Sequence, residues 1–339
     1  MGAILRGIEY VFPETKVSNE ELSKEFPEYD FSKFEEKVGI KYRYWTSANE
    51  TALDLAEKAC LKLFARFDKE NVDYIIYCTQ SPEYILPTTA CILQERLQLS
   101  NEVGAYDFNL GCSGYVYGLS MAYALISSNQ AKNVLLVTAE TYSKYLNPLD
   151  KSNKAIFGDA ATASLISIDS FEGFGSFKFG TDGGGFDKLI IKNGGTKFPK
   201  AESPENKSYG SDNTYSDNDL YMNGPEVFNF TTKRIPSFTK NVLDQNNLEI
   251  KDVDQFIFHQ ANSFMLDFLR KKIGIGREAF YNNILDGGNT VSCTIPIALK
   301  RYSESTDLNS SNLPQKITIV GFGVGLSWAG GVININNKL

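Results

Sequence analysis

The sequence predicts an α/β fold built from two duplicated halves with pseudo-twofold symmetry. Runs rich in β-branched and aromatic residues alternate with helical patterns, which is typical of parallel βαβ units with helices over the sheet. The same order of elements recurs later in the chain, which indicates an internal repeat. A length of 339 residues suits about two domains or one large α/β body. We expect the halves to cover residues 1–168 and 169–339.

The first half supplies the pattern that is then repeated. A helix that begins near Cys112 is indicated by apolar residues at helical spacing, Tyr115, Leu119, Ala122 and Ile126. In chain order we expect a strand, a helix, a strand, a helix and a strand at Tyr74–Cys78, Thr88–Leu97, Ala105–Phe108, Cys112–Ser127 and Asn133–Val137.

The second half repeats this order, and its first strand aligns without a gap. Val72–Tyr77 reads Val-Asp-Tyr-Ile-Ile-Tyr and Val253–Phe258 reads Val-Asp-Gln-Phe-Ile-Phe. If the halves stack face to face, Cys112, His259 and Asn289 meet at the centre of the molecule. In each half a glycine-rich turn then opens a helix and a hydrophobic strand follows, at Leu110–Ser113 and Val134–Val137, and at Gly287–Thr290 and Ile317–Val320.

Composition excludes several classes of protein. Hydrophobic residues make up 42% and charged residues 22% of the chain, as in an ordinary globular protein. No apolar run reaches the ~18–20 residues of a membrane-spanning helix. The start, MGAILRGIEY, lacks the layout of a signal peptide, so we expect a cytoplasmic protein. Five cysteines without paired spacing argue against a disulfide scaffold or a cysteine zinc site.

Charge and histidine content restrict the chemistry further. Lys+Arg 34 minus Asp+Glu 41 gives −7, and no long basic run occurs, so we expect no nucleic-acid partner. The chain has a single histidine, which excludes histidine-rich metal sites and any mechanism that needs two imidazoles from one chain. Any catalytic imidazole must therefore be His259.

Cys112 is a candidate nucleophile because of its position. It stands between Gly111 and Ser113-Gly114, where the helical pattern starts. The positive end of a helix macrodipole lowers the pKa of a thiol placed there, and a tight glycine turn lets a substrate approach the sulfur. The alternative is a small buried hydrophobic residue, which suits the other cysteines, Cys60, Cys78, Cys91 and Cys293.

Four other segments have open interpretations. His259 closes a strand, where a lone histidine is more often structural, and Asn289 stands in a turn-forming Gly-Gly-Asn-Thr sequence. Gly321–Gly325 has the glycine spacing of a dinucleotide fingerprint, but another strand follows instead of the required helix, so a hairpin with exposed N–H groups is the better interpretation.

Thr196–Asp219 is polar, and we expect a long solvated surface loop, either an inert insertion or a functional one.

Taken together, these motifs resemble the β-ketoacyl-acyl-carrier-protein synthase III family of the thiolase superfamily. The resemblance covers essentially the whole chain except Thr196–Asp219. It implies a five-layer αβαβα fold and a homodimer formed through the first half. The motifs are Asn109–Gly114, His259–Asn262, Gly287–Pro296 and Gly321–Trp328, supported by Lys154–Ala161, Met222–Phe228 and a Ser-Asn-Glu-Glu-Leu start.

The resemblance implies a catalytic triad of Cys112, His259 and Asn289. The cysteine takes an acyl group from a primer thioester, and a malonyl thioester then loses carbon dioxide and condenses with it to give a β-ketoacyl thioester. No metal or redox cofactor is implied. The histidine count separates the chain from elongating ketosynthases, which use two, and Gly321 replaces the second cysteine of degradative thiolases. The implied substrate-binding residues are Leu86, Asn262, Phe322, Gly323 and Val324.

The resemblance implies a role for each residue of the triad and for Val324, Phe322 and Leu86. The backbone N–H groups of Cys112 and Val324 stabilise the tetrahedral oxyanion. His259 and Asn289 donate to the thioester oxygen during decarboxylation, and Phe322 presents an apolar face to the departing carboxylate. Leu86 is the gate position, expected to enter the acyl tunnel of the partner subunit.

Departures from the family pattern leave the carrier open between coenzyme A and an acyl-carrier protein. Lys33 and Lys37 stand where the family has a tryptophan and an arginine around the adenine, and Phe264 replaces a docking arginine. Two other functions also stay open: transfer of the acyl group to a hydroxyl or amine, and a non-catalytic partner subunit. A basic patch for an acidic carrier is still predicted from Arg270, Lys271, Lys272 and Arg277, with a solvated helix face as the alternative.

Overall fold

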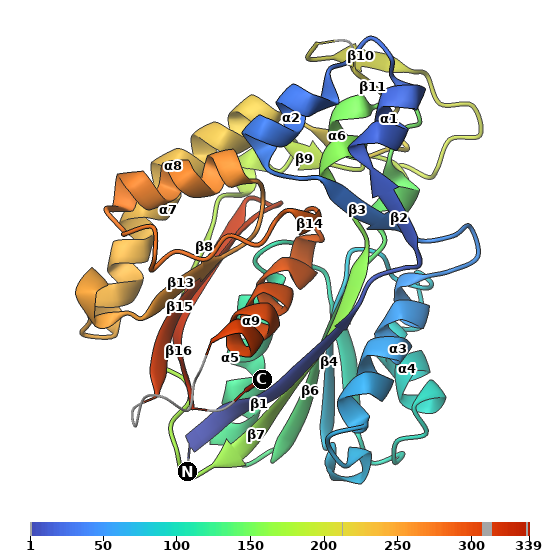
Figure 1. The fold of residues 1–339 in the computed structure, drawn as a ribbon. Coiled ribbons are helices and arrows are strands. Elements are labelled where there is room, and N and C mark those ends of the chain that lie inside the picture. Colours follow the sequence, from blue (N-terminus) through green and yellow to red (C-terminus); the bar gives the residue numbers. More distant parts are fainter. Residues whose placement is uncertain (1, 212, 307–313, 337) are drawn as a thin grey trace.

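A computed structural model describes residues 2–211, 213–306, 314–336 and 338–339. Two sheets are stacked with one layer of helices between them and one on each outer face (Figure 1). This arrangement is the predicted αβαβα fold. The outer helices are α3 (Ala52–Phe64) and α4 (Thr89–Arg96) on one side and α7 (Gly224–Gln245) and α8 (Ser263–Ile273) on the other, and the central ones are α5 (Gly114–Ser127) and α9 (Thr294–Ser305).

The two sheets share one pattern of strand directions. In each sheet a parallel pair, β4–β6 or β13–β15, is extended by two antiparallel strands, β7–β1 or β16–β8. The first sheet ends at β5, which runs parallel to β4. Its strands are β1 (Gly2–Val11), β4 (Tyr74–Cys78), β5 (Gly104–Phe108), β6 (Asn133–Glu140) and β7 (Ala160–Asp169), and those of the second are β8 (Lys178–Thr181), β13 (Gln255–Phe258), β15 (Gln315–Gly323) and β16 (Ser327–Ile335).

Each half of the repeat contains an equivalent hydrogen bond from the backbone to an aspartate side chain. The Asp73 carboxylate accepts from the backbone N–H of Asn133 at 2.8 Å, at the start of β6. The Asp254 carboxylate accepts from the backbone N–H of Lys316 at 2.7 Å, at the equivalent point of β15. The gapless alignment of the two Val-Asp segments therefore confirms the duplication, whereas the exact boundary at residues 168 and 169 stays a prediction.

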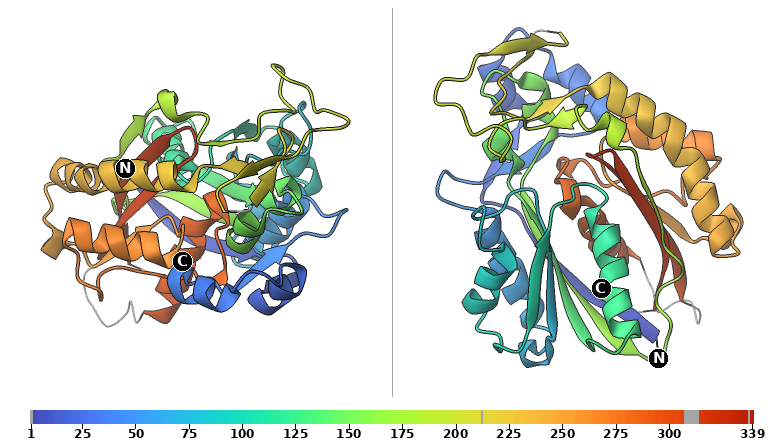
Figure 2. Two further views of the ribbon diagram at one scale, coloured as in Figure 1. Left: turned by 90° about the horizontal axis from the view of Figure 1, so that it is seen from above. Right: turned by 180° about the vertical axis from the view of Figure 1, so that it is seen from behind.

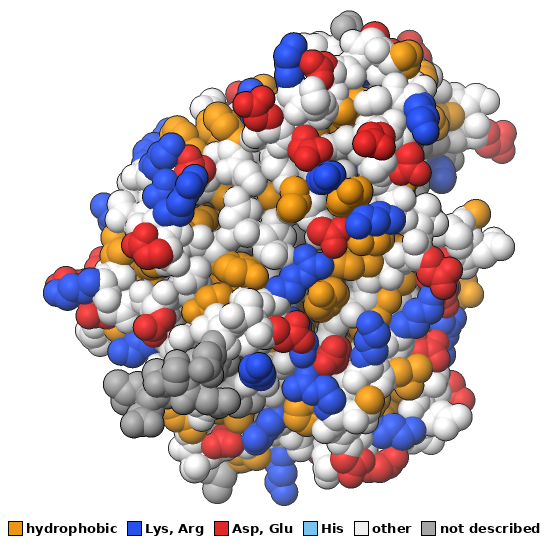
Figure 3. All heavy atoms as spheres, in the orientation of Figure 1, with side chains coloured by type: hydrophobic (Ala, Val, Ile, Leu, Met, Phe, Trp, Pro, Cys, Tyr) orange, Lys and Arg blue, Asp and Glu red, His pale blue; other side chains and the backbone are white. Residues whose placement is uncertain are grey.

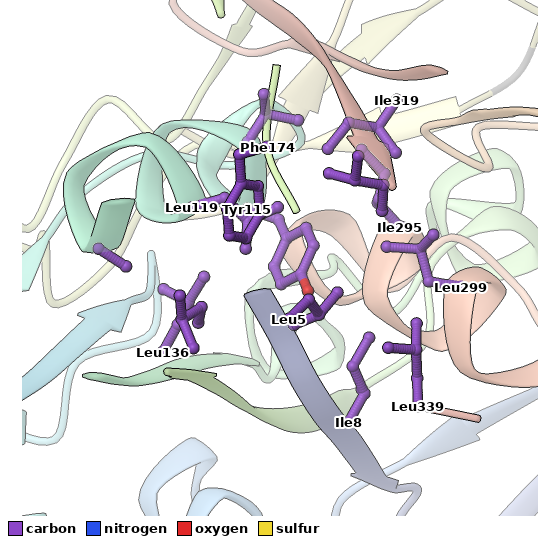
Figure 4. Packing of buried hydrophobic residues seen from close by; sticks show 14 of the residues in the cluster. Leu5, Ile8, Tyr115, Leu119, Leu136, Phe174, Ile295, Leu299, Ile319 and Leu339 are labelled. Carbon is purple, nitrogen blue, oxygen red and sulfur yellow. The ribbon is translucent and has the colours of Figure 1, made fainter. Parts of the chain in front are cut away.

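The main hydrophobic core fills the central layer. Tyr115 and Leu119 from α5 and Ile295 and Leu299 from α9 pack among side chains of both sheets (Figure 4). These residues are almost completely buried. Each central helix contacts both sheets, and Cys112 and Asn289 stand in the segments that lead into α5 and α9. Figure 2 shows the outer helices α7 and α8 side by side against the second sheet.

Smaller elements cover one end of the stacked sheets. They form two strand pairs, a three-stranded sheet and three short helices. These are β9 (Leu189–Ile190) with β12 (Tyr221–Met222), β10 (Lys207–Tyr209) with β11 (Asn213–Tyr215), the sheet of β2 (Thr15–Ser18), β3 (Tyr42–Trp45) and β14 (Asp286–Gly287), and α1 (Asn19–Glu25), α2 (Phe31–Val38) and α6 (Lys151–Ile156).

The stretch Thr196–Asp219 is only partly the solvated loop that its composition predicts. Residues 196–205 are exposed, but the following segment folds as the β10–β11 hairpin. The Tyr209 hydroxyl donates to the buried Asp150 carboxylate at 2.6 Å, and the Asn213 side-chain oxygen accepts from the backbone N–H of Ser152 at 3.2 Å. The prediction was wrong for this part because its partners lie in the loop before α6 and in α6 itself.

Candidate active site

Cys112, His259 and Asn289 line one cavity of about 170 Å³, although they come from three distant parts of the chain. All three are almost fully buried. Cys112 precedes α5, His259 follows β13, and Asn289 follows β14. The remaining lining residues are Tyr142, Ile156, Phe157, Leu189, Met222, Gly224, Val227, Phe228, Thr231, Ala261, Asn262, Met265, Phe322 and Gly323.

The turn that carries Cys112 is pressed against the end of β15. A Cβ atom added to Gly323 would lie 2.9 Å from the Cys112 sulfur, and one added to Gly321 would lie 2.6 Å from the Cys112 carbonyl oxygen. Such distances are shorter than real contacts of these atoms. The glycines of the Gly321–Gly325 run therefore allow the two halves to meet at the nucleophile, and the run continues into the β15–β16 hairpin, as predicted.

The resting thiol of Cys112 is neutral. Its pKa is raised to about 12, chiefly because burial disfavours the charged thiolate and also because of the Glu140 carboxylate. The backbone N–H groups of Cys112 and Val324 act in the opposite direction and lower the pKa. The prediction of a lowered pKa at a helix start was therefore wrong, because desolvation outweighs the favourable N–H groups.

The same two N–H groups are the predicted donors to the oxyanion. Val324 does not itself line the cavity, but its side chain packs in the cluster that contains Cys112. A tetrahedral intermediate formed on the sulfur would place its oxygen near these donors.

His259 is held at the end of β13 as a neutral imidazole. Its backbone N–H donates to the Val320 carbonyl at 2.8 Å, and its Nδ1 lies 2.7 Å from the Thr294 hydroxyl. Burial lowers the pKa of His259 to about 3. The Phe322 ring meets the imidazole edge-on, with ring centroids 5.6 Å apart. The imidazole can therefore work as a neutral hydrogen-bond donor or acceptor near neutral pH.

In the part of the chain that the structure describes, the amide N–H₂ group of Asn289 has no hydrogen-bond partner. Its backbone N–H donates to the Ile156 carbonyl at 2.9 Å, and its carbonyl accepts from the Gly158 N–H at 3.1 Å. Its side-chain oxygen accepts from the backbone N–H of Val291 at 2.9 Å. Val291 has φ +56°, an uncommon conformation for a β-branched residue, so the turn is strained at this point.

The structure places the predicted binding residues in two groups. Phe322, Gly323 and Asn262 line the cavity, and the Asn262 side-chain oxygen also caps α8 by accepting from the Met265 N–H at 2.8 Å. Leu86 lies outside the cavity, on the loop between β4 and α4, and is 79% exposed. Among the described residues, no three His, Cys, Asp or Glu side chains are grouped as a metal site requires.

Several residues of the site were not identified from the sequence. Phe157 and Met222 line the cavity and lie inside motifs on which the family resemblance rests. The sequence therefore marked both segments, but it gave neither residue a function. Tyr142 could not be identified from the sequence, because it lies outside all of the motifs named above. Glu140 lies at the end of β6, fully buried, and accepts from the Ser292 hydroxyl at 2.7 Å. Burial raises the pKa of Glu140 to about 8.

The cavity borders a surface of exposed aromatic rings. Phe228 lines the cavity and stacks on Phe264 at 5.6 Å between centroids, and Phe268 meets Phe228 at 5.4 Å. Phe264 is 47% and Phe268 37% exposed. The Lys37 ammonium lies 5.3 Å from the Phe264 ring, and that of Lys272 lies 5.7 Å from Phe268. We call Phe228, Phe264 and Phe268 the aromatic entrance.

The predicted basic patch beside this entrance is partly neutralised. Lys and Arg side chains gather over α8 on the face shown in Figure 3. Arg270 and Lys271 both pair with Asp267, at 2.8 Å and 2.6 Å. The Lys272 ammonium donates to the Thr232 carbonyl at 3.0 Å. The last turn of α8 therefore keeps an excess of positive charge, but less than its sequence suggests.

Comparisons with known proteins identify the family of the chain. The family model for 3-oxoacyl-[acyl-carrier-protein] synthase III matches residues 106–183, and its C-terminal counterpart matches residues 243–335. The β-ketoacyl-[acyl-carrier-protein] synthase III of Clostridium perfringens (strain ATCC 13124) is 36% identical over 328 residues, covering 95% of this chain and 96% of the relative.

Solved structures of the same kind cover the whole fold. A crystal structure of a 3-oxoacyl-(acyl-carrier-protein) synthase III has a TM-score of 0.95 and 42% identity, covering 99% of this chain and 100% of the other. A 3-oxoacyl-(acyl-carrier-protein) synthase from Burkholderia xenovorans LB400 has a TM-score of 0.88 and 32% identity, covering 100% and 96%. The family, fold class and enzyme class predicted from the motifs are thus confirmed. The chain belongs to the 3-oxoacyl-[acyl-carrier-protein] synthase III family and is an acyltransferase of this type.

Proposed function

We propose that the protein catalyses the decarboxylative Claisen condensation of an acyl thioester primer with a malonyl thioester, through an acyl group on Cys112. The main support is the shared buried cavity of Cys112, His259 and Asn289. A nucleophilic sulfur stands there beside an amide donor and a neutral imidazole. Acyl transfer uses the first group, and decarboxylation uses the other two.

The first half-reaction loads the enzyme. The Cys112 sulfur attacks the primer carbonyl, and the N–H groups of Cys112 and Val324 stabilise the oxyanion that forms. When the intermediate collapses, the carbon–sulfur bond to the carrier breaks. The proton of the Cys112 thiol is transferred to the departing carrier thiolate. Because the thiol is neutral at rest, deprotonation accompanies substrate binding and attack rather than preceding them.

The second half-reaction makes the new carbon–carbon bond. The bond between the malonyl carboxylate and the α-carbon breaks, carbon dioxide leaves, and the electron pair forms a thioester enolate. His259 and Asn289 donate to the enolate oxygen, while the apolar face of Phe322 disfavours the carboxylate. The α-carbon then attacks the acyl carbonyl, and Cys112 leaves as a thiolate that takes a proton from solvent. This scheme uses no metal or redox cofactor.

An acyl-carrier protein is the primer carrier that we favour over coenzyme A. The Lys33 ammonium pairs with Asp30 at 3.2 Å, and Lys37 lies over Phe264, so no aromatic–guanidinium pair stands at these positions to hold an adenine. The aromatic entrance offers an apolar path for a phosphopantetheine arm. The positive charge at the end of α8 suits the phosphate and an acidic carrier surface.

We also propose a homodimer that forms through the first half. Strand β5 ends its sheet, and the neighbouring loop exposes Ile85 (90%) and Leu86 (79%). Pairing of β5 with a second copy would cover this edge and bring Leu86 to the partner's acyl tunnel. Such an interface would bury well above ~2,000 Å². A monomer by light scattering at micromolar concentration would contradict this proposal.

Cytoplasmic location stays a prediction. All five cysteines are free thiols, as is typical of proteins in a reducing compartment. Among the described residues, no helix has both the length and the apolar character needed to cross a membrane.

Mass spectrometry with carrier-bound substrates tests the proposed function. The protein is incubated with acyl-carrier-protein primer and malonyl thioester, and both the enzyme and the products are weighed. Acylation of Cys112, release of carbon dioxide and a product two carbons longer support condensation. Acyl-enzyme formed without malonyl decarboxylation would instead indicate transfer to a hydroxyl or amine. No acylation with any thioester would indicate a non-catalytic subunit.

A further inference from the structure

The hydroxyl of Thr294 lies between two hydrogen-bond acceptors beside His259. Its oxygen is 2.7 Å from Nδ1 of His259 and 3.1 Å from the Val291 carbonyl oxygen. All three residues are almost fully buried, at 2% exposure for His259, 3% for Thr294 and 1% for Val291. A hydroxyl has one proton, so it can donate to only one of these acceptors at a time.

The direction of that proton decides the tautomer of the histidine. If Thr294 donates to Val291, its oxygen must accept from Nδ1–H, and Nε2 then carries a lone pair. If Thr294 donates to Nδ1, the single proton of the neutral ring must be on Nε2. Only the second arrangement gives His259 a donor on the nitrogen opposite Thr294.

The local contacts allow the hydroxyl to donate to the histidine. Its oxygen lies within hydrogen-bond distance of Nδ1. The Val291 carbonyl also accepts from the backbone N–H of Thr294, so it keeps a partner when the hydroxyl turns away. Thr294 is the first residue of α9 and directly follows the short helix Val291–Cys293, which holds its hydroxyl beside the ring.

We propose that Thr294 is a positioning residue that donates its hydroxyl proton to Nδ1 and holds His259 in the Nε2–H tautomer. This inference rests on the proposed function, because decarboxylation needs a donor to the enolate oxygen. The opposite tautomer would present a lone pair to that oxygen and would oppose the developing charge. Removing one donor of this kind costs about 10²–10³-fold in rate.

The single histidine of the chain allows the tautomer to be observed directly. Full-length protein labelled with ¹⁵N-histidine and free of a polyhistidine tag gives ring signals from His259 alone. Long-range ¹H–¹⁵N correlations distinguish a protonated from an unprotonated ring nitrogen. We expect Nε2 protonated and Nδ1 unprotonated near neutral pH. Protonated Nδ1 in the wild-type protein would overturn the inference, whatever the activity.

Three variants identify Thr294 as the cause. Thr294→Val keeps the shape of the side chain without the hydroxyl, and Thr294→Ser keeps the hydroxyl. Thr239→Val is the matched control, because Thr239 is buried in α7 and donates to the Ile235 carbonyl at 2.9 Å without a histidine nearby. We expect a change of tautomer population in Thr294→Val alone. The wild-type pattern in Thr294→Val would show that something else sets the tautomer.

Activity measurements separate this inference from the proposed function. We expect Thr294→Val to lower malonyl decarboxylation ~10–10²-fold, within the cost of one weakened donor, with acylation of Cys112 within threefold of wild type. Thr294→Ser should retain decarboxylation. Equal losses of both half-reactions in Thr294→Val would indicate a merely structural role and overturn the inference. Absence of decarboxylation in the wild-type protein would instead refute the proposed function. The NMR measurement would then still test whether Thr294 holds His259 in the Nε2–H tautomer.

Discussion

The side-chain oxygen of Asn289 accepts a 2.9 Å hydrogen bond from the backbone N–H of Val291, and this bond fixes which end of the amide is left for a ligand. With its oxygen engaged, the amide can offer only its N–H₂ group to a ligand in the cavity. An asparagine in a glycine-rich turn normally stabilises the turn. Here the side chain does this with its oxygen, and its nitrogen has no hydrogen-bond partner among the described residues.

Replacing Asn289 by alanine should separate the two half-reactions. We expect Asn289→Ala to lower decarboxylation and condensation ~10²–10³-fold, because one donor to the enolate oxygen is lost. Acylation of Cys112 should remain largely intact, since its donors are backbone N–H groups. Release of carbon dioxide from malonyl thioester and the mass of the acyl-enzyme measure the two steps. A variant that folds but loses both steps equally would contradict this division.

The complementary change is Cys112→Ala. It should abolish the acyl-enzyme, because no sulfur remains to be acylated. Malonyl decarboxylation should persist, since His259 and Asn289 are untouched. Both steps are measured as for Asn289→Ala, with thermal unfolding as the control for folding. Full condensation activity in Cys112→Ala would show that the acyl group is not carried by this residue.

Gly323 should be intolerant of even one added methyl group. The Cβ of alanine would lie 2.9 Å from the Cys112 sulfur and 3.0 Å from its Cβ, so Cys112 or β15 must shift. Overpacking of this kind costs about 1–3 kcal/mol, and we expect Gly323→Ala to slow acylation at least ~10-fold. Gly195→Ala is the matched control, because nothing lies within 4 Å of its added Cβ. Equal acylation rates in Gly323→Ala and Gly195→Ala would contradict the proposed close contact between Gly323 and Cys112.

The repeat and the three central residues were predictable because they depend on local patterns. Asp73 and Asp254 stand at the same place in two aligned segments, and each carboxylate accepts a backbone hydrogen bond from the start of the neighbouring parallel strand, β6 or β15. Turns that open helices carry glycines in both halves. Cys112 and Asn289 stand in the segments that lead into the two central helices, and both line the same cavity.

The features that were missed depend on contacts between distant segments. The pKa of Cys112 follows from its burial against β15, which no property of the Cys112 segment reveals. The hairpin within Thr196–Asp219 is polar, and it is held by partners such as Asp150 rather than by an apolar face. Thr294 stood inside a recognised motif, but its role depends on the position of His259 in space.

Glu140 should make the stability of the protein fall as pH rises. Burial raises its pKa from an ordinary 4.5 to about 8 in the folded state. A carboxyl group whose pKa is higher in the folded than in the unfolded state favours folding when it is protonated. This contribution to stability is complete below the pKa of the unfolded state, about 4.5, and is lost as the pH rises through 8. At ~1.4 kcal/mol per pKa unit the loss amounts to a few kcal/mol. Glu140→Gln cannot ionise, so its free energy of unfolding should fall less over this range.

Urea unfolding at several pH values measures this difference. Glu95→Gln, exposed on α4, is the control and should follow the wild-type protein. We compare the free energy of unfolding at pH 5 and pH 9 for the three proteins. A Glu140→Gln variant whose stability changes in parallel with that of the wild type would show that Glu140 does not titrate with a raised pKa.

The same substitution should make the nucleophile more reactive at alkaline pH. The Glu140 carboxylate raises the pKa of the Cys112 thiol, so removing its charge should lower that pKa and increase the thiolate fraction. Below pH 7 the wild-type Glu140 is mostly protonated, and the two proteins should react alike. Above pH 8 the wild-type carboxylate is charged, and Glu140→Gln should be alkylated faster. The rate of iodoacetamide addition to the Cys112 peptide, followed by mass spectrometry against pH, measures this. Identical profiles above pH 8 would mean that Glu140 does not act on the sulfur.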